Sequence, residues 1–215
     1  RTDVRIIGVS AGVSYGPLGC THTTMHDFAS MRALPNLTIL APCDAVQTEY
    51  LTDLLCQFTG PVYMRMGRGD VPPVYEAGEK FEIGKIKTVC EGTDATIIAC
   101  GEMVAPAKKA AELLQAEGIS VRVLDCFTIQ PMDTKTVEKA LRETRAVVTV
   151  EEHSTRGGLG EAVSHIAAEL RGSAPMRLLG LPEEVVIGKS QELFAYYGLT
   201  PEGISAAIKE RLERE

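Results

Sequence analysis

The run Ala95-Thr96-Ile97-Ile98-Ala99-Cys100, near the middle of the chain, decides the fold class. It is short, apolar and rich in β-branched residues, which predicts a buried strand rather than a helix. A helical pattern follows, with Pro106 placed as in a first helical turn and Gly118 where a left-handed residue ends a helix. A buried strand followed directly by a helix is the repeating unit of α/β folds with parallel sheets.

The same alternation of short apolar runs and helical patterns continues toward both ends of the chain. It predicts an α/β fold of three layers, α/β/α, with mostly parallel sheets. Helices are expected over residues 44–58, 158–171 and from 200 onward. The predicted strands cover residues 4–9, 37–41, 62–66, 95–100, 121–125, 146–150 and 176–180.

A domain boundary is predicted between Gly67 and Gly84. Glycine, proline and charged residues are crowded at its start, in Gly67-Arg68-Gly69-Asp70-Val71-Pro72-Pro73, before the regular pattern resumes. Residues 84–215 are long enough for a complete domain, and residues 1–75 are expected to be the last portion of another. Because a predicted strand begins almost at Arg1 and no initial Met is present, we expect further residues upstream.

Composition excludes several classes of protein. The chain has 215 residues, 45% of them hydrophobic and 24% charged, which is typical of a globular protein and not of a disordered one. Its net charge of −7 and pI near 5.2 disfavour binding to nucleic acid or to an anionic membrane surface. The sequence also has no apolar run near the ~20 residues that a membrane span needs.

The six cysteines give no sign of a metal site. They form no Cys-x-x-Cys pair and no ligand-like spacing with the four histidines, and some lie in apolar runs, where Cys packs as a small hydrophobic residue. We therefore expect reduced thiols, a cytoplasmic location and no bound metal.

Residues 14–24 form the first candidate site, a loop with glycine and proline between a predicted strand and a helix. Ligands of open α/β sheets bind in such loops at the carboxyl ends of strands. His22 supplies a side chain that exchanges a proton near neutral pH. In the alternative interpretation, Thr21 caps a helix whose exposed side carries His22 and His26. The residue types alone leave both interpretations open.

Two segments with arginine are further candidates. Arg65 and Arg68 flank a glycine at the end of a predicted strand, a pattern suited to a phosphate or carboxylate. Alternation along the strand equally places Arg65 on one sheet face as a structural residue. Residues 156–161 lead into a predicted helix, and their N–H groups could bind an anion at its N-terminus. The preceding Glu151 and Glu152 would repel a phosphate, however, which favours a tight turn. These glutamates and the His that follows are suited to acid/base chemistry, although capping or interface roles are more common for such clusters.

Several segments, taken together and in order, match the pattern of one known family. Thr21-His22 followed by residues 31–44 (Met-Arg-Ala-Leu-Pro-Asn-Leu-Thr-Ile-Leu-Ala-Pro-Cys-Asp) is similar to the pyrimidine-binding domain of transketolases and deoxyxylulose-phosphate synthases. Arg68 and residues 60–65 resemble the end of that domain. Similarity to the family's C-terminal domain lies in residues 147–153, 157–160 and 197–202. The resemblance covers almost the whole chain in order and looks most like the C-terminal subunit of a split transketolase.

This resemblance implies transfer of a two-carbon ketol unit between sugars or sugar phosphates, with thiamine diphosphate and Mg²⁺ as cofactors. It implies activity only with a partner, the N-terminal subunit with the diphosphate-binding domain, and a homodimer formed through the C-terminal parts. Two roles carry over by resemblance: His22 as catalytic residue and substrate contact, and Arg68 as the residue that binds the substrate phosphate. The residues that bind the cofactor are expected upstream of Arg1 and on the partner.

The sequence departs from the family pattern in three places. Leu18 stands where sugar-specific members have an Asp that binds a substrate hydroxyl, so the donor ketose stays open. Ser10 stands near the position of a second substrate-facing His. The segment with the family's catalytic Glu is absent and is expected before Arg1.

Two alternatives also stay open. A deoxyxylulose-phosphate synthase or a 2-oxo-acid dehydrogenase β-like subunit would differ in its donor, which an assay with pyruvate distinguishes. Residues 84–215 are also compatible with a non-catalytic module for dimerisation and interaction.

Overall fold

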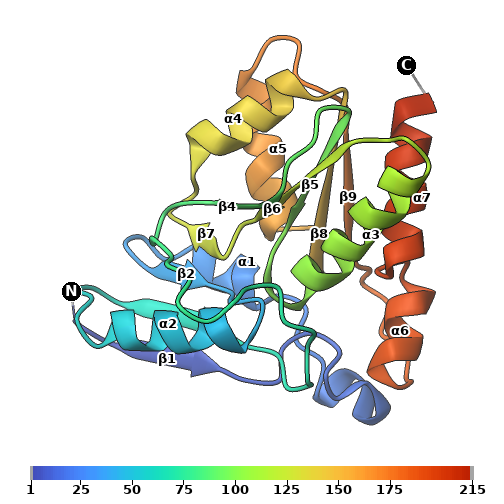
Figure 1. Cartoon of the computed structure of the whole chain (residues 1–215). Helices are drawn as coiled ribbons and strands as arrows, with labels where there is room; N and C mark the ends of the chain where they lie inside the picture. Colours follow the sequence, from blue (N-terminus) through green and yellow to red (C-terminus); the bar gives the residue numbers. More distant parts are fainter. Residues whose placement is uncertain (1, 214–215) are drawn as a thin grey trace.

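The computed structural model describes residues 2–213, which form two sheets covered by helices (Figure 1). Every strand pairing is parallel except those of β7 with β2 and β4 with β6. The first sheet has the order β1 (Arg5–Gly8), β3 (Val62–Arg65), β2 (Thr38–Leu40), β7 (Thr128–Gln130). The second has the order β4 (Lys87–Cys90), β6 (Val121–Asp125), β5 (Ala95–Ala99), β8 (Ala146–Ser154), β9 (Met176–Leu181). The predicted α/β fold with mostly parallel sheets is confirmed.

Helices cover both faces of the second sheet. In Figure 1, α3 (Val104–Ala116) and α7 (Pro201–Glu213) lie on one side of it, with α4 (Thr134–Glu143) and α5 (Leu159–Glu169) on the other. Side chains of α2 (Ala45–Leu55) pack on one face of the first sheet, and Phe28 of α1 (Asp27–Arg32) packs on the other. Shorter helical segments are η1 (Gly16–Thr21), η2 (Gly101–Met103) and α6 (Ser190–Tyr196).

Local sequence signals fix several helix ends. The Asp44 carboxylate accepts a hydrogen bond from the N–H of Gln47 at 2.8 Å, and the Gln47 side chain accepts one from the N–H of Cys43. Asp44 is thus the N-cap of α2, in a variant of the capping box, at the first residue of the predicted helix. Gly118 takes φ 82° just after α3, a conformation that glycine adopts without strain.

The segments before and after residue 84 share both a sheet and their cores. β7, from the later segment, completes the first sheet beside β2. One hydrophobic cluster joins Leu51 of α2 to Leu114 of α3, and the other joins Phe28 of α1 to Leu124 of β6. β7 and β4 were not predicted, because both are short strands at sheet edges. The two segments are therefore packed together along a broad contact.

Asp125, at the end of β6, links the two segments from the inside. Its Oδ2 accepts hydrogen bonds from Nε2 of Gln47 at 2.7 Å and from the hydroxyl of Tyr75 at 2.8 Å. Among the described residues its Oδ1 has no hydrogen-bond partner. Complete burial raises the pKa of Asp125 to about 7, although the two donors act in the opposite direction.

We expect the Asp125→Asn substitution to stabilise the chain in a pH-dependent way. The pKa is near 4 in the unfolded chain and about 7 in the folded one. The wild-type carboxyl therefore contributes stability below pH 4 that is lost as the pH rises through 7. An amide does not titrate, so the variant should match the wild type below pH 4. In urea unfolding, its stability relative to the wild type should rise by about 3 kcal/mol between pH 5 and pH 8.

Asp133 provides the contrasting control. Although burial alone would raise its pKa, hydrogen bonds from the Thr136 hydroxyl and from backbone N–H groups lower it below the ordinary value. Its contribution is present above pH 4 and is lost in acid, so Asp133→Asn should destabilise the chain at pH 8. An equal effect of Asp125→Asn at pH 5 and pH 8 would contradict the assignment.

Candidate functional site

The predicted loop lies at the carboxyl end of β1 and is closed at its base. The N–H of Thr24 donates to the carbonyl of Gly12 at 3.0 Å, which makes an isolated antiparallel bridge. Gly12 and Gly19 take φ values of 57° and 66°, which allow the chain to turn tightly here. We call residues 11–24 the η1 loop.

His22 and Arg68 meet at the ring of Tyr15. The guanidinium carbon of Arg68 lies 4.2 Å from the ring centroid, and the His22 ring meets it edge-on with centroids 5.8 Å apart. Nδ1 of His22 is 2.9 Å from Oγ1 of Thr21. Both His22 and Arg68 are exposed, so a ligand can reach them. The two predicted side chains are thus brought to one aromatic ring, and Leu18 of the same loop is also exposed.

Two cavities lie beside the segment that contains Arg68. One, of about 510 Å³, has Ser14, Arg68, Glu102 and Ser190 in its lining. The second, of about 640 Å³, also includes Glu102 and extends to Asp44 at the start of α2. Arg68 therefore borders a cavity to which the segments before and after residue 84 both contribute.

Arg65 is a structural residue and not a ligand contact. It is 6% exposed, and its Nε lies 3.1 Å from Oδ2 of Asp27. Its Nη2 donates to the carbonyl of Glu152 at 2.6 Å, and its guanidinium lies 4.7 Å from the centre of the Phe28 ring. These partners compensate for the loss of water around a buried charge.

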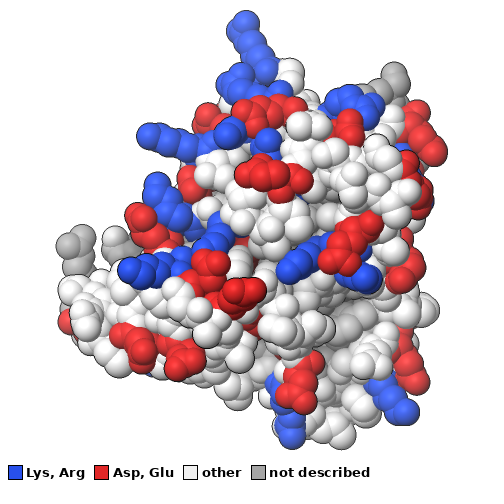
Figure 2. Space-filling model, viewed as in Figure 1, with Lys and Arg blue, Asp and Glu red and all other residues white. Residues whose placement is uncertain are grey.

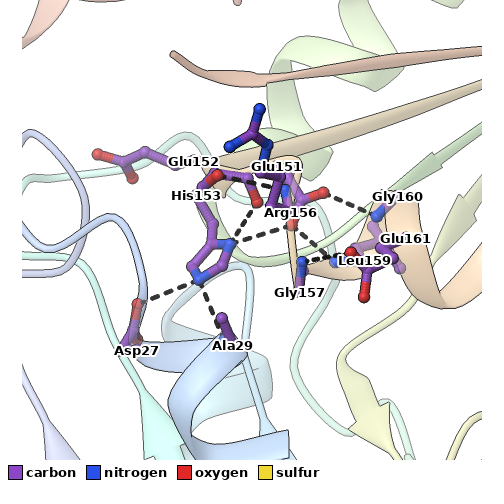
Figure 3. A network of polar contacts seen from close by, with 12 residues as sticks. Asp27, Ala29, Glu151, Glu152, His153, Arg156, Gly157, Leu159, Gly160 and Glu161 are labelled. Carbon is purple, nitrogen blue, oxygen red and sulfur yellow. Dashed lines mark hydrogen bonds and ion pairs between the residues drawn. The ribbon is translucent and has the colours of Figure 1, made fainter. Parts of the chain in front are cut away.

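His153 is also enclosed, between α1 and the end of β8 (Figure 3). Its Nε2 accepts from the N–H of Ala29 at 3.4 Å and lies 3.8 Å from Oδ1 of Asp27. Burial, followed by the charge of Arg65, lowers the pKa of His153 to about 4. A neutral, fully buried imidazole joins the two segments and does not exchange protons with a ligand.

Glu151 occupies the anion position at the start of α5. Its two carboxylate oxygens accept hydrogen bonds at 2.7 Å from the N–H groups of Leu159 and Gly160, as Figure 3 shows. A Cβ on Gly158 would lie 1.9 Å from this carboxylate, which explains the glycine there. The chain's own side chain thus fills the anion cradle, and the structure supports the tight turn. Capping is one of the two roles, capping or an interface, that the sequence favoured for this acidic cluster.

Tyr15, Asp27 and Ser190 were not among the residues predicted to form the site. Tyr15 lies inside the predicted loop, where an aromatic residue among glycine and proline is itself a signal of a contact. Asp27 and Ser190 carry no comparable signal, because their partners are Arg65 and the backbone of Val13, far away in the sequence.

The remaining features of the described residues concern charge, cysteines and helix length. On the face shown in Figure 2, Lys and Arg side chains are interspersed with Asp and Glu. The six cysteines are free thiols. Within residues 2–213, no helix has the length and apolar character required to cross a membrane.

Two family models match the chain. The model of the transketolase pyrimidine-binding domain matches residues 1–73, and that of the transketolase C-terminal domain matches residues 84–204, more than half of the chain. This chain belongs to the transketolase family. The resemblance noted in its sequence is confirmed.

Relatives of this transketolase chain include subunits of divided enzymes. It is 46% identical to one subunit of the apulose-4-phosphate transketolase of Phocaeicola vulgatus, over 100% of this chain and 69% of the relative. It is 38% identical to a putative transketolase C-terminal section of Methanocaldococcus jannaschii, over 100% and 68%.

Solved transketolase structures have the same fold. A split-gene transketolase, described as an inactive β4 tetramer, superposes with a TM-score of 0.88 at 39% identity, over 98% of this chain and 67% of that one. A transketolase mutant from Pichia stipitis superposes with a TM-score of 0.80 at 23% identity, over 99% and 30%, and shows the fold alone.

The described part of this transketolase chain does not by itself offer a site for a metal cofactor. Residues 2–213 contain no group of three or more His, Cys, Asp and Glu side chains placed to hold a metal ion. The Asp44 carboxylate, beside the larger cavity, already accepts hydrogen bonds from the N–H groups of Gln47, Val74 and Tyr75.

We predict that Glu151→Ala lowers the free energy of unfolding by about 3 kcal/mol, because two buried N–H groups lose their acceptor. Urea unfolding at pH 7 measures the change. Glu161 is the matched control: it accepts from the N–H of Gly157 at the same helix end, but its side chain is 58% exposed. Glu161→Ala should cost under about 1 kcal/mol, since water replaces the carboxylate. If both variants lose the same free energy of unfolding, Glu151 is not a buried cap of α5.

Proposed function

We propose that this chain is the C-terminal subunit of a two-chain transketolase that transfers a two-carbon ketol unit between phosphorylated sugars. The names of the relatives support this, since one is a transketolase subunit and another a C-terminal section. The split-gene transketolase that has this fold is described as inactive when it is a β4 tetramer, which supports a need for a partner chain. The partner in our proposal is the N-terminal subunit with the diphosphate-binding domain.

The observation that carries the proposal is the Tyr15 ring, which contacts both Arg68 and His22 on an exposed loop. A stacked guanidinium keeps its in-plane N–H donors available for a phosphate, and its charge persists at any physiological pH. Arg68 also borders the 510 Å³ cavity. We assign Arg68 to the substrate phosphate.

His22 is the proposed catalytic residue. The contact of its Nδ1 with the Thr21 hydroxyl and the edge-on contact with Tyr15 restrict the ring. The Nε2 atom is then the one that touches substrate and gives or takes a proton from a hydroxyl of the reacting sugar.

Thiamine diphosphate, when bound, supplies the carbanion chemistry of ketol transfer. Since the described residues hold no metal-binding group, we assign the diphosphate and Mg²⁺ to the partner subunit. The part played by residues 2–213 is to bind and orient the substrate through Arg68 and His22.

Leu18 bears on the choice of substrate. Its apolar side chain is 53% exposed on the η1 loop, where a carboxylate of sugar-specific members would bind a hydroxyl. A site without that acceptor discriminates less between a substrate that has the hydroxyl and one that lacks it. We propose a phosphorylated ketose donor whose recognition depends on its phosphate more than on this hydroxyl; the related subunit from Phocaeicola vulgatus likewise belongs to an enzyme named for a sugar phosphate.

We further propose that two copies of the chain pair through their C-terminal parts, and that the enzyme serves carbohydrate metabolism in the cytoplasm. The six free thiols, three of them buried, suit a reducing compartment.

The test is ketol transfer by the complex of this chain with its N-terminal subunit, assayed with and without thiamine diphosphate and Mg²⁺. We expect cofactor-dependent transfer from a phosphorylated ketose. Arg68→Ala should raise KM for that donor about 10- to 100-fold, because a charge-assisted contact to phosphate is lost. His22→Ala should lower kcat by about 100-fold or more.

Matched controls are His165→Ala and Arg171→Ala, which change exposed residues in and just after α5 and should retain wild-type kinetics. Transfer from pyruvate in place of a ketose would overturn the proposed donor class. Turnover without thiamine diphosphate would overturn the proposed chemistry, and wild-type kinetics in an Arg68→Ala, His22→Ala double variant would overturn the site.

A further inference from the structure

Both backbone groups of one residue in the η1 loop are bound by side chains from beyond residue 84. The N–H of Val13 donates to Oε1 of Glu152 at 2.7 Å. Its carbonyl accepts a hydrogen bond from the Ser190 hydroxyl at 2.9 Å. It also accepts one from the N–H of Gly16 at 2.8 Å, which closes the turn at the start of η1. Val13 is 1% exposed, so these groups have no access to water. The position of η1 therefore depends on two side chains far away in the sequence.

Three glycines of the loop lie so close to the segment beyond residue 84 that a side chain would not fit there without a shift. A Cβ on Gly12 would lie 2.2 Å from the Glu152 carboxylate, and one on Gly16 would lie 2.4 Å from the carbonyl of Gly188. A Cβ on Gly19 would lie 3.1 Å from Ile187. One side of the loop is thus pressed against the end of β8 and the segment that leads into α6.

The remaining loop residues are those available to a ligand. Leu18 and His22 are exposed, and half-buried Tyr15 contacts Arg68 and His22. Tyr15 follows Val13 after a single residue, within the turn closed by the hydrogen bond from the N–H of Gly16 to the carbonyl of Val13. A displacement of Val13 is therefore transmitted directly to Tyr15.

Glu152 is itself rigidly held. Its side chain is 3% exposed, and its backbone carbonyl accepts from buried Arg65 on β3 at 2.6 Å. Ser190 stands at the first turn of α6, whose Leu193 packs in the hydrophobic core. Each residue thus connects the loop to a well-packed element of the fold.

We propose that Glu152 and Ser190 are positioning residues, which hold Val13 and thereby set the Tyr15–His22–Arg68 group in the geometry that binds substrate. The inference rests on the proposed function of that group. It assigns the segment beyond residue 84 a part in the reaction, through two side chains that act on the backbone of Val13. Small errors of placement at a reacting centre reduce rates strongly, because bound geometry supplies much of the rate enhancement.

The experiment compares Ser190→Ala with Ser190→Thr in the complex of this chain with its N-terminal subunit. Ser164→Ala is the matched control, because the Ser164 hydroxyl also donates to a carbonyl, at 2.8 Å, but within α5 and away from the loop. Hydrogen exchange of amides 13–20 and steady-state kinetics with a phosphorylated ketose are measured for each.

For Ser190→Ala we expect about 10-fold faster exchange of the loop amides and about a 10-fold rise in KM for the donor, with a smaller change in kcat. Ser190→Thr, which keeps the hydroxyl, and Ser164→Ala should resemble the wild type in both measurements. Loop exchange and KM that stay unchanged in Ser190→Ala would overturn the proposal for Ser190. A lower Tm with unchanged KM would also overturn it, because it indicates a merely structural role.

Glu152 is tested by Glu152→Gln against Glu152→Ala. The amide keeps an acceptor for the Val13 N–H and should preserve KM, whereas alanine removes it and should raise both KM and loop exchange. If Glu152→Ala folds and keeps the wild-type KM and loop exchange, the proposed role of Glu152 is overturned. If Glu152→Ala does not fold, a raised KM in Glu152→Gln overturns it. Hydrogen exchange of the loop amides can be measured without turnover. It therefore still tests whether Glu152 and Ser190 hold Val13 if the wild-type complex fails to transfer ketol units. That failure would count against the proposed function alone.

Discussion

A buried guanidinium, that of Arg65 on β3, is the interaction on which most of the structure around the site depends. A charge removed from water costs several kcal/mol unless its surroundings replace the lost hydration. Here the replacement comes from Asp27 at the start of α1, the Phe28 ring and the Glu152 carbonyl at the end of β8. Because each partner is needed, α1 and β8 are both fixed relative to the first sheet. The carboxylate of Glu152 then reaches the η1 loop from a backbone that Arg65 holds.

Strands were predictable wherever the buried run was apolar. β6 has its predicted bounds, and β2 and β5 differ from theirs by one or two residues. β8 continues four residues past the predicted end, through Glu151, Glu152 and His153. Charged residues signal the end of a strand when considered alone. Here they stay buried because Glu151 accepts hydrogen bonds from the start of α5. Glu152 and His153 accept theirs from residues more than 100 positions away in the sequence.

The residues of the candidate site were selected for a different reason. His22 and Arg68 were selected by family resemblance, and residue chemistry alone left His22 undecided between a loop ligand and an exposed helix residue. Their meeting at Tyr15 depends on how β1 and β3 lie side by side, which no local pattern encodes. The contacts of Val13 with Glu152 and Ser190 span most of the chain and were not visible in the sequence.

The strand β7 has a consequence for how a transketolase gene can be divided. The glycines and prolines between residues 67 and 84 indicate a domain boundary, where a gene could be divided into two reading frames. A break there would put β2 and β7, neighbours in one sheet, on different polypeptides. It would also divide both hydrophobic clusters and separate Val13 from the side chains that hold it. Packing therefore favours keeping the two segments in one reading frame, as in the relatives from Phocaeicola vulgatus and Methanocaldococcus jannaschii, which match this chain from end to end.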